Sequence, residues 1–175
     1  MVAGGNFGAM GDADRTPLPR IEDDAVEAFW ARFVASLDGT AIAPFTYVGP
    51  FGDSVELADE LIELILHGPK RATAGALVEY EASDDPLPVV GDRWIACDGR
   101  GMARAVLRTT DVRVGPLSSV DEAFAWDEGE GDRTRADWLR MHSAYFERAL
   151  PAMGEPYHDE IETVFERFEL EYSEP

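Results

Sequence analysis

Cysteine, lysine and long apolar runs are nearly absent from this sequence. Among 175 residues there is one cysteine, Cys97, so neither an intramolecular disulfide nor a cysteine-based zinc site can form. No run of about 18 apolar residues occurs, and residues 1–20 lack a basic start followed by an apolar stretch. We therefore expect a soluble, cytoplasmic protein without a membrane partner.

Positive charge is also scarce. Fifteen Lys and Arg residues stand against 35 Asp and Glu residues, which gives a formal net charge of −20. Such a charge repels polyanions at long range and argues against a general nucleic-acid-binding protein. However, eleven of the fifteen basic residues lie between Gly68 and Arg148. A local basic cleft is compatible with this distribution, and so is the simpler interpretation of a solvated acidic surface that maintains solubility.

Fourteen of the fifteen basic residues are Arg, and the exception is Lys70 in the stretch HGPKRATAG. A desolvated amine can lose its proton, whereas a guanidinium stays charged at physiological pH. For Lys70 to act as a base near neutral pH, its pKa must fall from about 10.4 by roughly three units, which burial in an apolar cleft can supply. The alternative is a surface lysine after a helix C-terminus, where the helix dipole favours positive charge.

Lys70 belongs to a short element, G-x-K-x-x-T, that runs from Gly68 to Thr73. Gly68 and Pro69 end the helix predicted after Ser54, so Lys70 lies in a turn that leads into a strand. A three-residue offset around such a turn can bring the amine of Lys70 and the hydroxyl of Thr73 within hydrogen-bond reach. An amine beside a hydroxyl is an arrangement that can activate a weak nucleophile.

The apolar pattern predicts one α+β domain after a disordered lead-in over residues 1–20, which are rich in Gly, Pro and Asp. Helical spacing predicts helices that begin near Asp23, after Ser54 and after Thr134. Ser119 starts a capping box that predicts a further short helix. Strands are predicted for five segments: 74–80, 93–97, 103–109, 110–114 and 162–172. Because strands and helices do not alternate regularly, we expect a small barrel-like sheet, mixed or antiparallel, with helices packed over its ends.

An acidic stretch, WDEGEGD, covers residues 126–132 and interleaves carboxylates with glycines. It lacks the ligand spacing of an EF-hand loop, so we expect no metal site. One of its glutamates could instead serve as a general acid or orient Lys70. A flexible acidic linker between two helices is the alternative interpretation.

The helix predicted after Thr134 has an aromatic face formed by Trp138, His142, Tyr145 and Phe146. An aromatic stripe at helical spacing usually belongs to the core. Alternatively, His142 could hydrogen-bond a ligand and the aromatic rings could stack on a base.

Four motifs occur together in one order: G-x-K-x-x-T, V-G-D at 90–92, E-G-E-G-D at 128–132 and W-x-x-x-H at 138–142. In this combination the chain resembles the ASCH-domain family, in the branch with a longer helical C-terminal part. The resemblance covers residues 51–172, which we expect to form the ASCH domain after an N-terminal helix and connection over residues 21–50. It implies a β-barrel related to the PUA fold, with a cleft beside the barrel suited to RNA or a nucleoside.

The resemblance also implies roles for individual residues. In the small amidohydrolase branch, which removes the acetyl group of N4-acetylcytidine, catalysis is assigned to the Lys and Thr of G-x-K-x-x-T and to a downstream Glu. These positions correspond to Lys70, Thr73 and Glu128. Glu130 is so near in the sequence that a shift in register would assign the Glu to Glu130 in place of Glu128. The hypothesis is that Lys70 is the base, Thr73 attacks an acyl carbonyl or positions water, and Glu128 transfers a proton or orients the amine. We expect no cofactor.

Other members of the superfamily have been linked to RNA cleavage with the equivalent lysine. In that case Lys70 would stabilise phosphate charge as an ammonium, which is the opposite protonation state. A simple RNA-binding module is a third alternative, with Lys70 and Arg71 on phosphate and Trp138 or Tyr145 stacked on a base. The net charge of −20 favours a small nucleoside-like substrate over long RNA.

The N-terminal helix carries three aromatic residues, Phe29, Trp30 and Phe33. They could pack on the barrel or on a second copy of the chain, and exposed aromatics here would indicate a homodimer.

Overall fold

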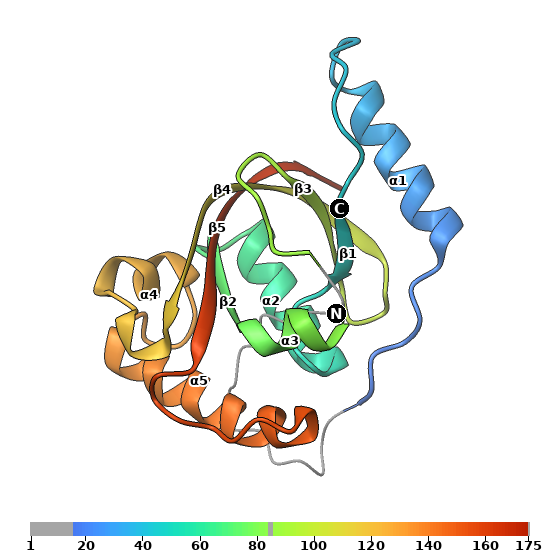
Figure 1. The fold of residues 1–175 in the computed structure, drawn as a ribbon. Coiled ribbons are helices and arrows are strands. Elements are labelled where there is room, and N and C mark those ends of the chain that lie inside the picture. The colour runs from blue at the N-terminus through green and yellow to red at the C-terminus, as the bar shows by residue number, and fades with distance from the viewer. Residues whose placement is uncertain (1–15, 84–85, 175) are drawn as a thin grey trace.

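The computed structural model describes residues 16–83 and 86–174, so most of the predicted disordered lead-in lies outside the described residues. Five strands form one curled sheet in the order β1-β3-β4-β5-β2 (Figure 1). The strands are β1 Tyr47–Pro50, β2 Ala72–Ala76, β3 Arg93–Cys97, β4 Ala103–Pro116 and β5 Glu162–Ser173. Strand β1 pairs parallel with β3, and the other neighbours are antiparallel. The expected α+β fold with a mixed, barrel-like sheet is therefore confirmed.

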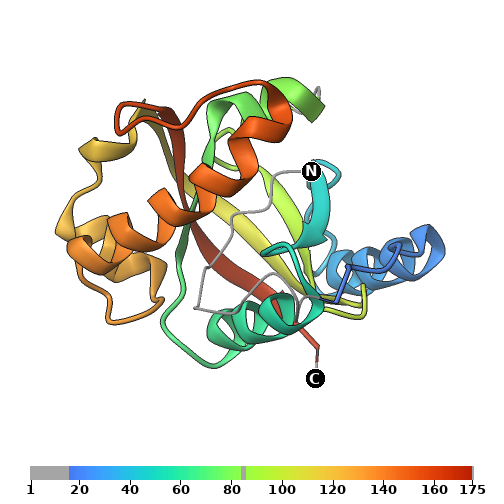
Figure 2. The same ribbon diagram turned by 90° about the horizontal axis from the view of Figure 1, so that it is seen from below.

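Within the described residues, five α-helices surround this sheet: α1 Asp23–Ala35, α2 Val55–Leu66, α3 Leu77–Ser83, α4 Glu122–Glu128 and α5 Arg135–Ala149. Helices α4 and α5 cover the end formed by β2 and β5, and Figure 2 shows α1 on the side of the molecule away from α5. No helix in the described ranges is long and apolar enough to cross a membrane.

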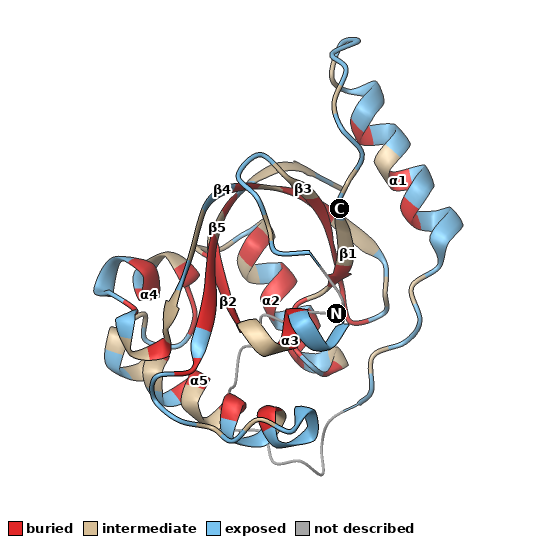
Figure 3. Ribbon diagram, in the orientation of Figure 1, coloured by how far each residue is buried: buried red, intermediate tan, exposed pale blue. Residues whose placement is uncertain are grey.

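Strand alternation explains how two helices share strand β3. Trp94 and Ala96 point to the face covered by α2, whereas Ile95 and Cys97 point to the face covered by α1. As a result, β3 is buried on both faces from Trp94 to Cys97 (Figure 3). Burial also raises the pKa of the Cys97 thiol to about 12, as expected for an inert core cysteine.

Local capping sets where three of the helices begin. The Ser54 hydroxyl accepts a hydrogen bond from the Leu57 amide, and Thr134 caps α5 in the same way, both as predicted. The short helix α4 is capped by Asp121, however, and the Ser119 capping box is wrong because Ser119 belongs to a 3₁₀ turn. Helix α1 begins at Asp23 itself, with Glu22 at the N-cap position.

Three predicted elements differ from the structure. The strand expected over 74–80 ends at Ala76, because the Glu79 carboxylate accepts a hydrogen bond from the Ala76 amide at 2.7 Å and starts α3 instead. The two strands expected over 103–114 are one long strand, β4, whose register shifts let it follow the curled sheet. The expected connection before residue 51 contains β1, whose partner β3 lies far along the sequence.

Helix α1 packs its aromatic face on its own sheet. Phe29 and Phe33 are each 1% exposed and contact the Tyr172 ring of β5 at centroid distances of 5.6 Å. Trp30 packs on Phe33 and Phe45. Because these rings have partners within the chain, the homodimer through this helix stays a prediction without support from exposed aromatics.

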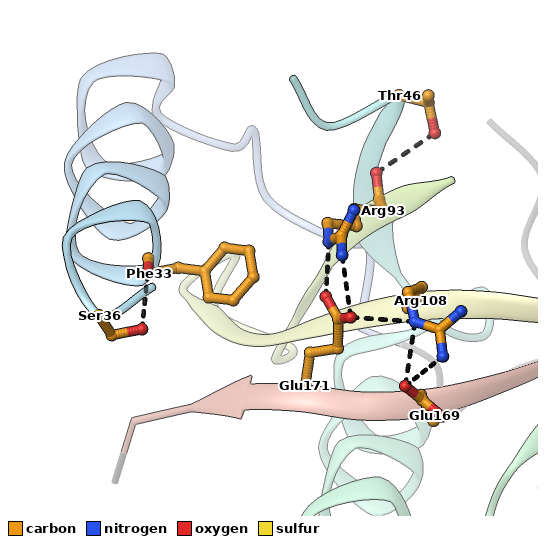
Figure 4. A network of polar contacts seen from close by, with 7 residues as sticks. All are labelled: Phe33, Ser36, Thr46, Arg93, Arg108, Glu169 and Glu171. Carbon is orange, nitrogen blue, oxygen red and sulfur yellow. Dashed lines mark hydrogen bonds and ion pairs between the residues drawn. The ribbon is translucent and has the colours of Figure 1, made fainter. Parts of the chain in front are cut away.

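On the same side as α1, Arg and Glu side chains cross strands β3, β4 and β5 (Figure 4). Glu171 accepts from Arg93 at 2.6 Å and lies 3.0 Å from the Nε of Arg108, which also contacts Glu169. These ion pairs are partly exposed, so each contributes about 1 kcal/mol or less.

Candidate functional site

Lys70 is fully buried in the turn between α2 and β2, so the alternative of a surface lysine is wrong. Its Nζ donates to Glu130 Oε1 and, at 3.0 Å, to the backbone carbonyl of Ala72. The Nζ also lies 3.9 Å from Glu128 Oε1 and 5.2 Å from the centroid of the Phe51 ring. The sole lysine of the chain is thus held by two buried carboxyl groups.

Gly129 brings both carboxyl groups to Lys70. It has a φ of +75° after the end of α4, and a Cβ at this position would lie 2.7 Å from the Lys70 amide nitrogen. Only glycine allows this close backbone approach, and the residues on either side, Glu128 and Glu130, then both turn toward the lysine. The glycine of the E-G-E pattern is therefore explained by this close approach to Lys70, and the interpretation of the stretch as a flexible linker is not needed.

Glu128 connects this lysine to the aromatic face of α5. Its Oε2 accepts from the Trp138 indole N–H and lies 3.6 Å from His142 Nε2. His142 Nδ1 is 3.0 Å from the Trp138 carbonyl, so this nitrogen carries the proton. Lys70, Glu128, Glu130 and His142 therefore form one buried cluster, called here the lysine cluster.

Burial and charge act in opposite directions within the lysine cluster. Burial disfavours the Glu128 carboxylate, but the charges of His142 and Lys70 hold its pKa below the usual value. Burial likewise disfavours charged His142, and the Glu128 charge outweighs it, so the pKa of His142 is raised. For Glu130 burial dominates and raises the pKa to about 7. Glu130 is thus the carboxyl that can take up a proton near neutral pH.

A cavity of about 230 Å³ lies beside the barrel, next to the lysine cluster. Its apolar wall includes the rings of Tyr47, Phe51, Tyr80 and Trp94. Its polar groups come from Thr46, Thr73, Thr109, Asp92 and Glu166. Among the described residues that line it there is no Lys, Arg or His, so this cavity has carboxyl groups but no cation.

Comparison with known proteins identifies the family of this chain. The family model for the ASCH domain matches residues 47–172. The chain belongs to the ASCH-domain family. A crystal structure of a DUF984 protein from Enterococcus faecalis V583 has a TM-score of 0.74 and 30% identity, and the match covers 84% of this chain and 88% of that one.

A second solved structure, an ASCH domain from Lactobacillus crispatus JV V101, has a TM-score of 0.74 at 24% identity. That match covers 86% of this chain and 95% of the other, and it supports the fold. No curated protein matches the chain. The resemblance found in the sequence is therefore confirmed at the level of family and fold.

Thr73 is the one predicted site residue that lines the cavity of this ASCH domain. Its hydroxyl is buried and has no hydrogen-bond partner among the described residues. Lys70 does not line the cavity but contacts residues at its wall, because its Nζ lies against the carbonyl of Ala72, next to Thr73, and against the ring of Phe51. The lysine cluster and the cavity therefore meet at β2 and Phe51.

The other predicted site residues lie outside the cavity lining. His142 belongs to the lysine cluster, and the Trp138 indole N–H donates to Glu128 of that cluster. The Tyr145 hydroxyl donates to buried Glu79 at 2.5 Å. Arg71 donates to the carbonyls of Ile65 and Lys70 at the end of α2. The structure gives these side chains packing and capping contacts, and their roles in substrate binding stay predictions.

No group of three or more His, Cys, Asp or Glu side chains within residues 16–83 and 86–174 is arranged to hold a metal ion. The two glutamates of the acidic stretch, Glu128 and Glu130, belong to the lysine cluster and contact Lys70.

Glu166 is a cavity residue that sequence reasoning missed. It lies directly opposite Thr73 in the β2–β5 pairing, and Thr109 donates to its Oε1 at 2.5 Å. Burial raises the pKa of Glu166 to about 7, against the lowering effect of the Thr109 hydrogen bond. Strand alternation offered a signal, because Glu166 falls on the same face as the buried residues Val164 and Phe168.

The raised pKa of Glu166 predicts a pH-dependent cost in stability. The folded state binds the proton of Glu166 more tightly than the unfolded state does. The stability gained from this tighter binding is fully present below about pH 4.5 and is lost as pH rises through about 7. Glu166→Gln, which cannot ionise, should therefore gain about 3 kcal/mol of unfolding free energy relative to wild type between pH 4.5 and pH 8. Urea unfolding at several pH values measures this difference.

The matched control is Glu169→Gln on the same strand, at a partly exposed position. Its unfolding free energy should follow the wild-type pH profile. Parallel profiles for wild type and Glu166→Gln would show that burial does not perturb Glu166.

Proposed function

We propose that this ASCH domain binds a nucleoside in the cavity beside the barrel and hydrolyses an N-acyl group from its base. The observation that carries the proposal is the unpartnered hydroxyl of Thr73 in the cavity wall, one residue from the carbonyl that Lys70 contacts. A buried hydroxyl without a hydrogen-bond partner lowers the stability of the folded state. Such groups are often retained because they have a catalytic role, and a nucleophile is one example.

The size and charge of the cavity support a small neutral ligand. A volume of about 230 Å³ with aromatic walls suits a flat ring. Asp92 and Glu166 lie in the lining, and no cation does among the described lining residues. Such a lining opposes phosphate binding within the cavity, and the net charge of −20 opposes a long polyanion around it.

The proposed chemistry begins with one proton shared by Lys70 and Glu130. The pair can exist as ammonium and carboxylate or as amine and carboxylic acid, and the direct contact between Lys70 Nζ and Glu130 Oε1 gives the proton a path between the two groups. In that form Lys70 accepts the hydroxyl proton as Thr73 Oγ attacks the acyl carbon. Glu128 stays ionised and stabilises the ammonium that results.

The remaining steps return the enzyme to its starting state. The C–N bond breaks as the leaving nitrogen takes the proton from Lys70, which leaves an acyl ester on Thr73. Water then attacks the ester, gives one proton back to the Thr73 oxygen and releases the carboxylic acid. Glu128 or Glu130 can assist in these transfers, and the geometry gives Glu130 the direct contact with Lys70.

Ribonuclease activity or RNA binding is the second candidate. The contacts of Lys70 with Glu130 and with the Ala72 carbonyl are those that an ammonium makes, and an ammonium would serve as a phosphate-contacting charge. On this alternative, RNA binding weakens steeply as salt increases.

Hydrolysis of N4-acetylcytidine by wild type and by Lys70→Arg, measured across pH, tests the proposed function. Arg keeps the charge and cannot deprotonate, so we expect turnover by wild type and a loss of about 10²- to 10⁴-fold in the variant. Arg108→Lys, on the outer face of the sheet, is the control and should retain wild-type turnover.

Two outcomes contradict the hydrolase. The first is a wild-type protein that turns over neither N4-acetylcytidine nor related N-acylated nucleosides. The second is equal turnover in Lys70→Arg, which would mean that Lys70 supplies only charge. Salt-sensitive RNA binding in either case would favour the second candidate.

A further inference from the structure

The cavity wall places a carboxyl group opposite the proposed nucleophile. Thr73 and Glu166 are direct partners in an antiparallel pair, so their side chains leave the same face of the sheet about 5 Å apart at Cβ. Both residues line the cavity. A ligand held by Glu166 therefore lies within reach of the Thr73 hydroxyl.

Glu166 differs from the other buried glutamates of the chain. Glu79, Glu128 and Glu130 accept hydrogen bonds from Tyr145, Trp138 and Lys70, and none of the three lines the cavity. Glu166 is 6% exposed and lines it, with its Oε1 bound by the Thr109 hydroxyl. Thr109 thereby orients a carboxyl group that remains at the cavity surface.

We propose, on the basis of the proposed function, that Glu166 recognises the base by pairing with a ring nitrogen and the adjacent exocyclic N–H, as found in cytosine and its N4-acyl derivatives. A protonated carboxyl group offers the complementary set, one donor and one acceptor in a plane. N4-acylation leaves one N–H on the exocyclic nitrogen, so the same edge is present before and after hydrolysis. The pairing sets the exocyclic nitrogen, and with it the acyl carbon, beside Thr73.

The surroundings of Glu166 favour this neutral form. Burial contributes most and raises the pKa of Glu166 to about 7. Asp92, from the turn before β3, adds a smaller effect from the cavity lining, because its negative charge opposes ionisation of Glu166. The titratable rings of Tyr47 and Tyr80 line the same cavity, where aromatic faces can hold a planar base.

A cavity with carboxyl groups and aromatic walls could also bind an organic cation, and pH separates the two cases. Base pairing by a protonated Glu166 weakens as pH rises through about 7, whereas cation binding by the carboxylate strengthens over the same range. The two ligand classes therefore predict opposite slopes.

The test is calorimetric binding of cytidine between pH 5.5 and pH 8.5 by wild type, Glu166→Gln and Glu166→Leu. Wild-type affinity should fall by about 10-fold or more across this range. Glu166→Gln should bind like wild type at low pH and lose the pH dependence, because its amide is a permanently neutral donor and acceptor. Glu166→Leu should lose about 10- to 100-fold in affinity. Glu169→Gln is the control and should be unchanged.

Cytidine carries no acyl group, so this experiment is independent of hydrolysis. Affinity that rises with pH, or tighter binding of N3-methylcytidine, which has a positively charged ring and a blocked ring nitrogen, would overturn the proposal in favour of a cation. Unchanged affinity in a folded Glu166→Leu variant, or no binding by wild type, would also overturn it. If cytidine binds as described and N4-acetylcytidine is not hydrolysed, the recognition role of Glu166 stands and the hydrolase proposal fails. If Glu166→Leu hydrolyses N4-acetylcytidine as fast as wild type does, the hydrolase proposal stands and the recognition role fails.

Discussion

Lys70→Met is expected to lower the free energy of unfolding by about 3–5 kcal/mol at pH 8, because removal of one partner leaves the Glu130 carboxylate buried without its cation. The loss should shrink as pH falls. Glu130 already has a pKa of about 7, and without the Lys70 charge it protonates more readily, which removes the uncompensated charge. Urea unfolding at pH 5.5 and pH 8 measures both effects.

The double variant Lys70→Met, Glu130→Leu should recover most of the stability that Lys70→Met loses, since it removes both charges together. A double-mutant cycle with the single Glu130→Leu variant gives the coupling energy of the pair. Both variants that lack Lys70 should be inactive toward N4-acetylcytidine, so stability and catalysis separate. Additive losses in the cycle would contradict the close pairing of Lys70 with Glu130.

Thr73→Val should reduce turnover of N4-acetylcytidine by at least about 10³-fold while cytidine binding is retained, because valine keeps the shape and removes the nucleophile. The same change should raise the free energy of unfolding by about 1 kcal/mol, since the buried hydroxyl has no partner in the described structure. A rise in stability together with a loss of turnover is the signature of a functional hydroxyl.

Thr109→Val is the matched comparison for this prediction. Its hydroxyl donates to Glu166, so its removal should lower the free energy of unfolding by about 1–3 kcal/mol. If Thr73→Val is destabilised to a similar degree and still turns over substrate, Thr73 has a structural role and the proposed nucleophile is wrong.

Features encoded by neighbouring residues could be predicted from the sequence. The caps at Ser54 and Thr134 are side-chain bonds within one turn of backbone, and the end of α2 follows from Gly68. The rarity of lysine pointed to Lys70, which is indeed buried against the acidic stretch. Local pattern was sufficient in each case.

Features that depend on distant partners could not be predicted. Strand β1 has four residues and exists because β3 pairs with it, and the strand propensity of residues 77–80 is overridden by the Glu79 cap of α3. The importance of Glu166 depends on which strands flank β5. The division of contacts between Glu128 and Glu130 depends on the left-handed conformation of Gly129, which no pattern of charges reveals.

The complete burial of Lys70 also determines how this protein reacts with reagents and enzymes that modify lysine. Because the sequence has one lysine and its side chain is inaccessible, no side-chain amine meets solvent in the native state. Acylation or conjugation at lysine then requires the α2–β2 turn to open first. The rate of labelling at Lys70, compared with that of a free amine, reports the population of the opened state at one defined position.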